Sequence, residues 1–544
     1  LLSAYKDNTD TQDLSFDSST KVLSLTDGGT VDLSGLSSSS GASSLNGLTD
    51  VLVETNSIYV GQDPSSTTNS ASYNVAVGAT ALDAVTTADK NVAVGHNALT
   101  SNTEGYANTS IGTESLESNT TGSYNVAVGY EALEDNTTGS GNSALGFDAL
   151  YLNTTGGSNT AIGNSALLSN TTGGKNTAVG RQALTSNTTA SNNIAVGYQS
   201  LKGNTTGTEN IAVGVNALES NTTGHSNIVI GTDALTKSTT ANWNVVVGDS
   251  AMTENTTGYG NIAIGPKALQ NNTTGNGNVS IGGDALRANT TAGLNSALGA
   301  YALSTNTTGS ENVSIGYVSM YYNTTGIKNT ALGVGSLFSN TTANVNTAVG
   351  YAAMANNTTG YNNTAVGATA LNANTTGNNN SALGVNALLA NTTGGENVAI
   401  GENALSSNTT GGSNTSIGTS SLITNTTGDR NIAIGYQAYD AADTENDNLA
   451  IGIDALGGAI AGGEYNVAIG NFSLDANTSG EQNVAVGYSS LGANTTGKEN
   501  TAIGSEALKA NTTGKENTAI GSEALKANTT GKENTAIGSE ALKA

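Results

Sequence analysis

From Asn74 onward, hydrophobic and polar residues recur with a period of 17 residues. Each unit reads Asn, a Val/Thr/Ile/Ser-type residue, Ala, Val/Ile/Leu, Gly, two variable residues, Ala-Leu, two variable residues, Asn-Thr-Thr-Gly and two variable residues. We number these positions 1 to 17, as in the unit 125–141. The register holds through 28 units, with one residue inserted between Asn448 and Asn466. Such regularity predicts stacked repeats rather than separate globular domains.

A period of 17 residues is too short for paired helices, whose repeats take about 33 residues or more. It fits one turn of a parallel β-solenoid or β-roll. We expect two short strands per turn, at positions 1–5 and roughly 7–11. A helical or 3₁₀ turn is the alternative for the second segment, because residues 505–510 are rich in helix formers.

The Asn-Thr-Thr-Gly run predicts the turn that closes each coil. Asn and Gly tolerate positive φ, and Asn and Thr side chains can bond the local backbone. The Asn residues at position 1 are expected either to cap turns or to stack into a ladder in which each amide bonds the next. Neither role involves chemistry on a ligand.

The fixed and variable positions predict an inside and an outside. Position 4 is always Val, Ile or Leu and position 9 is almost always Leu, so both are predicted to be interior. Positions 6, 7, 10, 11, 16 and 17 accept almost any residue and are predicted to be surface. Such a thin coil buries little apolar area per turn and has no Cys for disulfides. We therefore expect a homotrimeric rod, with the small residues at positions 3 and 8 allowing close chain approach.

The first 73 residues lack the 17-residue period. Residues 14–17, 22–25 and 30–33 have the pattern of short strands, and residues 27–29 (Asp-Gly-Gly) are a hairpin-turn signal. Residues 1–36 are therefore interpreted as a small N-terminal β-meander.

The next segment joins the meander to the repeats. Residues 37–73 are interpreted as a linker and solenoid cap. The linker is rich in Ser at 37–44, and residues 48–60 are expected to supply a strand that covers the open edge of the first coil. Residues 74–544 form the repeat shaft.

Composition and charge restrict the possible partners. The 544 residues include no Cys, 17 Lys and Arg, and 42 Asp and Glu, which gives a net charge of −25. The acidic balance disfavours nucleic acid and anionic membranes, since both attract positive surfaces. No apolar stretch approaches the 18 residues needed to span a bilayer. We expect no nucleic-acid partner and no membrane insertion.

The sequence predicts no catalytic, cofactor or metal site, and no enzyme. His96 and His225 occupy different positions of distant units, so they cannot form one site. Acidic residues show no recurring ligand pattern, which leaves loose calcium binding as a minor alternative. The Asn-Thr-Thr run is also a glycosylation sequon, but the turn explains its recurrence. Ice binding by stacked Thr is a further alternative. It is a minor one, because adjacent Thr side chains would point opposite ways and would not form one flat array.

Aromatic residues recur at position 6. Exposed rings can stack on sugar rings, so these residues are candidates for receptor binding. The alternative is that each Tyr covers the strand edge of its neighbour. The candidates are Tyr130, Tyr198, Tyr317, Tyr351, Tyr436 and Tyr488.

The Asn-Thr-Ala-Val-Gly and Ala-Leu-x-x-Asn-Thr-Thr-Gly units of residues 74–544 resemble the repeats of phage tail-fibre proteins and related bacterial surface fibres. The Asn-x-Ala-Ile/Val-Gly core is also similar to the head repeat of trimeric autotransporter adhesins, a left-handed parallel β-roll wound as a homotrimer. That head repeat is shorter than 17 residues, so the shape of the coil need not transfer.

The resemblance implies an extracellular, non-enzymatic fibre shaft for adhesion or host recognition, in the first place a viral (phage) tail fibre in the virion. It also implies a cell-surface glycan or protein as receptor. A bacterial surface adhesin or extracellular filament subunit, located at the cell surface, is the alternative.

Overall fold

The computed structural model describes residues 14–17, 22–25, 30–32, 51–54, 56–61, 70–458 and 462–544. Throughout these ranges the chain forms β-strands and turns and no α-helix. The same residues therefore contain no helix of the length and apolarity that a membrane crossing requires. The chain divides into two compact units, Leu1–Ser226 and Asn227–Ala544, which are described separately.

The first unit contains strands β1 to β14. They are β1 Leu14–Asp17, β2 Val22–Leu25, β3 Thr30–Asp32, β4 Val51–Glu54, β5 Ser57–Gly61, β6 Val75–Gly78, β7 Val92–Val94, β8 Thr109–Ile111, β9 Val126–Val128, β10 Ser143–Leu145, β11 Thr160–Ile162, β12 Thr177–Val179, β13 Ile194–Val196 and β14 Ile211–Val213.

The second unit contains strands β15 to β33. They are β15 Ile228–Ile230, β16 Val245–Val247, β17 Ile262–Ile264, β18 Val279–Ile281, β19 Ser296–Leu298, β20 Val313–Ile315, β21 Thr330–Leu332, β22 Thr347–Val349, β23 Thr364–Val366, β24 Ser381–Leu383, β25 Val398–Ile400, β26 Thr415–Ile417, β27 Ile432–Ile434, β28 Leu449–Ile451, β29 Val467–Ile469, β30 Val484–Val486, β31 Thr501–Ile503, β32 Thr518–Ile520 and β33 Thr535–Ile537.

Strands β1 to β3 form a three-stranded antiparallel sheet in the order β1-β2-β3. Leu14 pairs with Leu25, and Leu23 pairs with Val31. This arrangement confirms the predicted meander. The hairpin turn predicted at 27–29 and the Ser-rich linker predicted at 37–44 lie outside the described residues.

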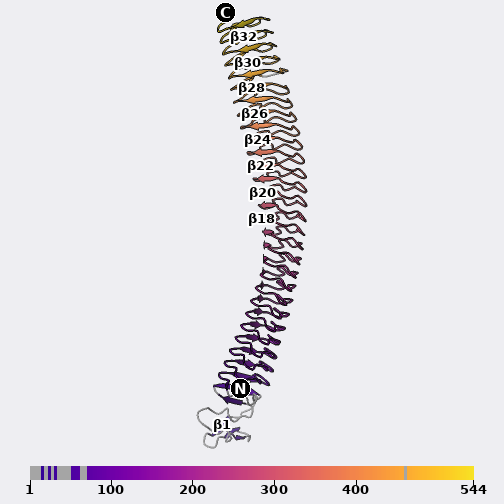
Figure 1. The fold of residues 1–544 in the computed structure, drawn as a ribbon, viewed down its shortest axis with the longest axis vertical. Coiled ribbons are helices and arrows are strands. Elements are labelled where there is room, and N and C mark those ends of the chain that lie inside the picture. The colour runs from indigo at the N-terminus through magenta and orange to yellow at the C-terminus, as the bar shows by residue number, and fades with distance from the viewer. Residues whose placement is uncertain are drawn as a thin grey trace. The chain divides into compact units, whose positions relative to one another are not determined.

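The repeats form a parallel β-solenoid, as the period predicts. Within each of the two compact units, the strands of successive repeats pair in parallel and in register. Ala144, for example, lies beside Ala127 of the preceding turn and Ala161 of the following turn. Between Leu449 and Val467 the step is one residue longer, yet the strands still pair in register. Figure 1 shows the strands of the second unit stacked one above another along one side of the ribbon.

The solenoid begins one strand earlier than the repeat pattern indicates. Strand β5 pairs in parallel with β6, with Ile58 beside Val75, so residues 57–61 occupy positions 1–5 of a preceding turn. The Asn74 backbone N–H donates to Ser57 Oγ at 2.9 Å, so Ser57 takes the role of Asn at position 1. Strand β4 pairs antiparallel with β5 and supplies the predicted covering strand.

The prediction of a second strand in each turn is wrong. Positions 6–11 form consecutive turns, with φ of +55° at Glu131 and +56° at Leu133. This left-handed backbone at positions 7 and 9 is incompatible with an extended strand, and the same alternation excludes the helical alternative. The segment still bonds both neighbouring turns: Glu131 N–H donates to Thr113 O, and Leu133 N–H donates to Ala149 O, each at 3.0 Å.

Positive φ is also absent from the Asn-Thr-Thr-Gly run, contrary to expectation. In the described 17-residue repeats, positive φ falls at positions 5, 7, 9 and 17, and in the one longer unit it also falls at Gly462. The predicted local side-chain bond is present, because Asn136 Nδ2 donates to Gly139 O at 3.0 Å. Glycine is needed at position 5: Gly129 has φ of +146°, and a Cβ there would lie 2.2 Å from Gly146 O in the next turn.

Buried asparagines form two ladders inside the coil. At position 1, Asn125 N–H donates to Asn108 Oδ1 of the preceding turn at 2.9 Å, and Asn125 Nδ2 donates to Gly139 O at 2.9 Å. At position 12, the side-chain amides bond each other directly, as when Asn136 Nδ2 donates to Asn119 Oδ1 at 2.8 Å. The expected ladder therefore exists, and direct amide-to-amide bonding is also found at position 12.

The ladder at position 12 is interrupted at Ser238 and Ala442. Asn221 Oδ1 and Asn425 Oδ1 of the preceding turns are buried there without a partner among the described residues. Elsewhere the ladder bonds satisfy amides that would otherwise be costly to bury.

The inside and outside of the strand are the reverse of the prediction. Ala144 at position 3 is buried, whereas Leu145 at position 4 is 50% exposed. In each of β6 to β33, position 3 is buried and positions 2 and 4 are half-buried or exposed. Positions 8 and 9 are also buried, so the small residues at positions 3 and 8 face each chain's own interior. Leu133 and the asparagine ladders leave little room opposite the strand, and a small residue fits there.

Candidate functional site

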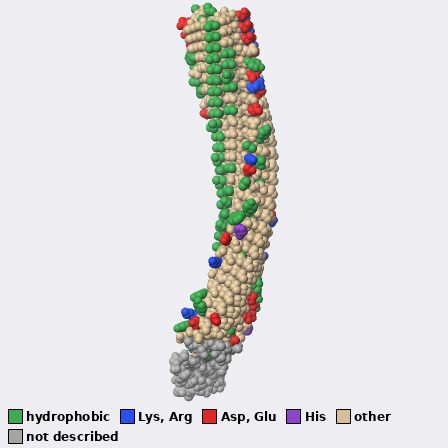
Figure 2. Space-filling model, in the orientation of Figure 1, with side chains coloured by type: hydrophobic (Ala, Val, Ile, Leu, Met, Phe, Trp, Pro, Cys, Tyr) green, Lys and Arg blue, Asp and Glu red, His purple; other side chains and the backbone are tan. Residues whose placement is uncertain are grey.

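The outward side chains at positions 2 and 4 make up what we call the strand face. In the repeats from Asn74 onward these positions hold only Val, Ile, Leu, Thr and Ser and never a charge. Many of the aliphatic side chains are well exposed, for example Leu298 at 47% and Leu332 at 44%. Figure 2 shows hydrophobic side chains in rows along the stacked turns. An apolar surface of this extent typically marks an interaction site.

The variable positions 6, 7, 10 and 11 make up what we call the turn face. Charged groups here pair within and between turns. Lys509 Nζ lies 2.6 Å from Glu506 Oε1 of its own turn, and Lys526 of the next turn also contacts Glu506. Hydrogen bonds from these two ammonium groups lower the pKa of Glu506 to about 2.

The six candidate tyrosines are all exposed and belong to the turn face. They occupy separate turns with at least one turn between any two, so they do not converge on one site. Three of them contact a ring of the adjacent turn, and no such ring partner is found within the described ranges for the other three. The pairs are Tyr130 with Phe147, Tyr317 with Tyr301, and Tyr488 with Phe472.

Tyr130 packs against an aromatic ring of the next turn. Its ring stacks on Phe147 with centroids 5.2 Å apart and an interplanar angle of 16°. The adjacent Glu131 carboxylate raises the pKa of Tyr130 to about 12, by hydrogen bonding and then by charge.

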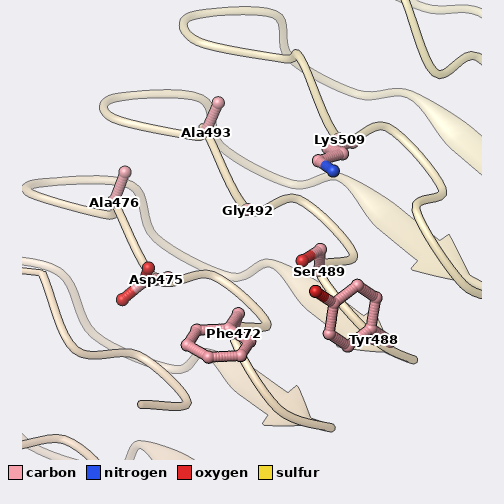
Figure 3. Close-up of a pocket in the computed structure, with 8 residues that line it drawn as sticks. All are labelled: Phe472, Asp475, Ala476, Tyr488, Ser489, Gly492, Ala493 and Lys509. Carbon is pink, nitrogen blue, oxygen red and sulfur yellow. The ribbon is translucent and has the colours of Figure 1, made fainter.

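A surface hollow of about 470 Å³ adjoins the pair of Phe472 and Tyr488. The two rings meet edge to face, with centroids 5.9 Å apart and an interplanar angle of 85°. Figure 3 shows Gly492 at the centre of the lining residues, between Asp475 and Lys509. Ala476, Ser489 and Ala493 complete the lining.

The hollow combines apolar rings with a few polar groups. Burial, followed by the charge of Asp454, raises the pKa of Asp475 above its usual range. Ser489 is 7% exposed, and within the described ranges no hydrogen bond of its hydroxyl is found. Lys509 is held by its 2.6 Å ion pair with Glu506. This arrangement suits a small, mostly uncharged ligand.

A second cluster on the turn face consists of Glu114, Glu131 and Glu134. One carboxylate oxygen of each lies within 4.8 Å of the others, which within the described ranges is the one group of three side chains spaced to hold a metal ion. Glu134 Oε2 is buried and lacks a hydrogen-bond partner there. Burial, and then the charge of Glu131, raises the pKa of Glu134 to about 7. Protonation of Glu134 is therefore favoured by burial first, and then by repulsion from the neighbouring carboxylates.

Of the remaining sequence candidates, His96 lies next to the carboxylate cluster, and its backbone carbonyl accepts a hydrogen bond from Glu114 N–H at 2.9 Å. His96 is exposed and His225 lies in a turn seven repeats later, where its Nδ1 is 3.2 Å from Ser226 Oγ. The sequon asparagines at position 12, such as Asn136, are fully buried in the ladder. Glycosylation at such a residue would require the coil to open.

Sequence reasoning identified Tyr488 and missed the rest of the hollow. The signal was an aromatic residue at position 7, Phe472, one turn before the Tyr at position 6, followed by Gly492 at position 10 where most turns have a side chain. No protein-family model and no curated protein matches this chain.

Proposed function

We propose that the protein is a non-enzymatic structural fibre shaft that acts in adhesion or host recognition, in the first place as a viral tail fibre. The observation that carries the proposal is the strand face: an uncharged, largely aliphatic surface that repeats in every turn and is left exposed. A single soluble chain gains nothing from exposing such a surface, whereas a fibre made of several chains buries it.

Copies of the same chain are the expected occupants of the strand face, most simply as a homotrimer. Burying a Val, Leu or Ile completely removes roughly 60–120 Å² of apolar surface. A side chain exposed by about two fifths therefore keeps roughly 25–50 Å². In the 19 strands of the second unit, positions 2 and 4 hold 29 aliphatic side chains. Together they keep roughly 700–1,450 Å², comparable to the ~800 Å² per partner of a standard interface.

Length and stiffness are what such a shaft would provide. Stacked strands advance about 4.8 Å per turn, so the strands of the second unit by themselves extend over ~90 Å. Backbone hydrogen bonds join every turn to both neighbours, and the asparagine ladders add side-chain bonds inside the coil. The shaft would hold a receptor-binding surface away from the particle or cell that carries it.

Native mass in solution, measured with light scattering and paired with negative-stain imaging, tests the assembly. We expect three chains and a thin particle. Replacing Leu298, Ile315 and Leu332 together by Lys places three charges on the strand face and should reduce the mass to that of one chain. The matched control replaces the exposed Thr308, Thr325 and Thr342 of the same turns by Lys and should leave the mass unchanged.

A wild-type mass of one chain would overturn the assembly. Equal masses for the two triple variants would overturn the assignment of the strand face. Antibody labelling of virions and of bacterial cells then separates the viral fibre from the alternative, a bacterial surface adhesin or extracellular filament subunit.

A further inference from the structure

The aromatic pair Phe472–Tyr488 has a close counterpart elsewhere in the second unit. Tyr301 and Tyr317 occupy the same positions, 7 and 6 of successive turns, and also meet edge to face, with centroids 6.3 Å apart and an angle of 81°. The two pairs therefore share a backbone setting, and their surroundings can be compared residue by residue.

At Tyr301–Tyr317 the following positions are filled by large rings. Tyr321 stacks on Phe338 with centroids 5.7 Å apart, and Tyr322 meets Phe338 at 5.1 Å. Tyr321 also lies 6.3 Å from Tyr301. These three rings cover the surface beside the pair.

At Phe472–Tyr488 the equivalent positions hold different residues. Gly492 stands where the other site has Tyr321, Ala493 stands in place of Tyr322, and Lys509 stands in place of Phe338. The loss of three rings opens the hollow of about 470 Å³. That volume lies within the ~300–1,000 Å³ typical of small-molecule sites.

The chemistry of the lining restricts the ligand. Phe472 and Tyr488 remain 37% and 52% exposed and offer ring surface to an apolar face. The Asp475 carboxylate accepts hydrogen bonds, and the Ser489 hydroxyl can donate or accept one. An anion is disfavoured, because Lys509 is already paired with Glu506 and Asp454 lies near Asp475. A sugar ring offers both an apolar face and several hydroxyl donors.

We propose that this hollow binds a hexopyranose unit of a neutral glycan, with the sugar ring against Phe472 and Tyr488 and its hydroxyls donating to Asp475. This proposal rests on the proposed function only in assuming that the glycan comes from a cell surface. The binding chemistry itself does not depend on it. It lies on the turn face and would stay open when copies pack through the strand face.

Saturation-transfer NMR on the full chain, with methyl glycosides of glucose, galactose and mannose as probes, tests the site. We expect transfer from the wild type to at least one of these probes. Gly492→Tyr should abolish it, because that variant recreates the filled arrangement that the chain already has at Tyr321. Asp475→Ala should weaken binding by about tenfold through loss of hydrogen bonds.

Tyr317→Ala is the matched control and should leave the transfer unchanged, because the surface beside that residue is already filled. A sialylated glycoside serves as a fourth, anionic probe. The proposal would be overturned by absence of transfer to every neutral probe, by equal transfer from the Gly492→Tyr variant, or by a preference for the sialylated probe. Loss of sugar binding in a chain of trimeric mass would refute the hollow and not the fibre. Sugar binding by a monomeric chain would refute the fibre and not the hollow.

Discussion

The strand face and the turn face belong to the same coil but differ in how much variation they accept. Positions 2–5 keep their character through every turn, whereas positions 6, 7, 10 and 11 hold residues as different as Pro266, Tyr321 and Lys509. Strand residues bond both neighbours in register and end at a glycine that fits no side chain. Most turn-face side chains are at least partly exposed to solvent. The repeated strand face can therefore specify assembly. A turn with unusual turn-face residues can add ligand recognition without disturbing the neighbouring turns.

The largest expected effect comes from replacing the glycine at position 5, where each strand ends. Gly350 lies at position 5 with φ of +137°, and a Cβ there would be 2.4 Å from Gly367 O and 2.6 Å from Gly367 C. Gly350→Ala should destabilise its region by more than ~3 kcal/mol, because neither backbone can move without losing turn-to-turn bonds. Hydrogen exchange resolved by peptide should show protection lost around residues 333–367.

The matched control is Gly335 on the turn face. It lies at position 7 with φ of +66°, and a Cβ there would have no heavy atom within 4 Å. Other turns carry ordinary residues with this backbone, such as Glu131. Gly335→Ala should cost about 1 kcal/mol, the strain of a left-handed non-glycine residue. Similar losses of protection in the two variants would contradict the difference between the faces.

The topology could be predicted from the 17-residue period, because residues one period apart in the sequence lie side by side in neighbouring turns of a solenoid. Parallel strands in 17-residue register follow from the invariant Asn and Gly positions. Hydrophobicity predicted the wrong side of the strand, because it assigns the larger apolar residue to the interior. Here the interior is narrow, and Leu133 with the asparagines fills it, so Ala127 faces inward and Val128 faces outward.

Other features depended on geometry that no local pattern contains. The left-handed φ of Leu133 is set by bonds to the adjacent turns, since a Leu alone does not favour it. Ser57–Gly61 was predicted within a covering strand and not as a solenoid turn, because it lacks the Asn and Ala of the repeat, although Gly61 stands 17 residues before Gly78. The hollow at Gly492 required knowing which residues of three turns lie side by side.

A smaller effect is expected from a substitution in the buried asparagine ladder at position 12. Asn340 Nδ2 donates to Asn323 Oδ1 at 2.8 Å, and Asn340 Oδ1 accepts from Asn357 Nδ2 at 3.1 Å. Asn340→Ala leaves the buried Asn323 Oδ1 without a donor. It also removes one of the two acceptors of Asn357 Nδ2, which keeps Gly360 O. The substitution should cost about 2–3 kcal/mol. Urea unfolding followed by circular dichroism measures it. Thr342→Ala, at an exposed position of the same run, should change the midpoint little, and an equal loss there would show that the ladder is unimportant.

The smallest effect tests whether turn-face chemistry stays local. The pKa of Glu134 is raised from 4.5 to about 7, first by burial and then by neighbouring carboxylates. In order of influence, these neighbours are Glu131, Asp135, Glu117 and Glu114. A raised pKa means that the folded chain favours the protonated acid. The resulting stability is complete below about pH 4.5 and is lost as the pH rises to about 7.

Glu134→Gln removes this dependence and should slow local hydrogen exchange at pH 8 by a few-fold relative to the wild type, with little difference at pH 4.5. Glu506 provides a control of opposite sign, because its pKa is lowered to about 2 by Lys509 and Lys526. Its contribution is present above about pH 4.5 and is lost only as the pH falls to about 2. Glu506→Gln should therefore speed local exchange at pH 8. If either variant altered exchange many turns away, the turn face would not be independent of the repeating interior, and recognition could not vary freely on a constant coil.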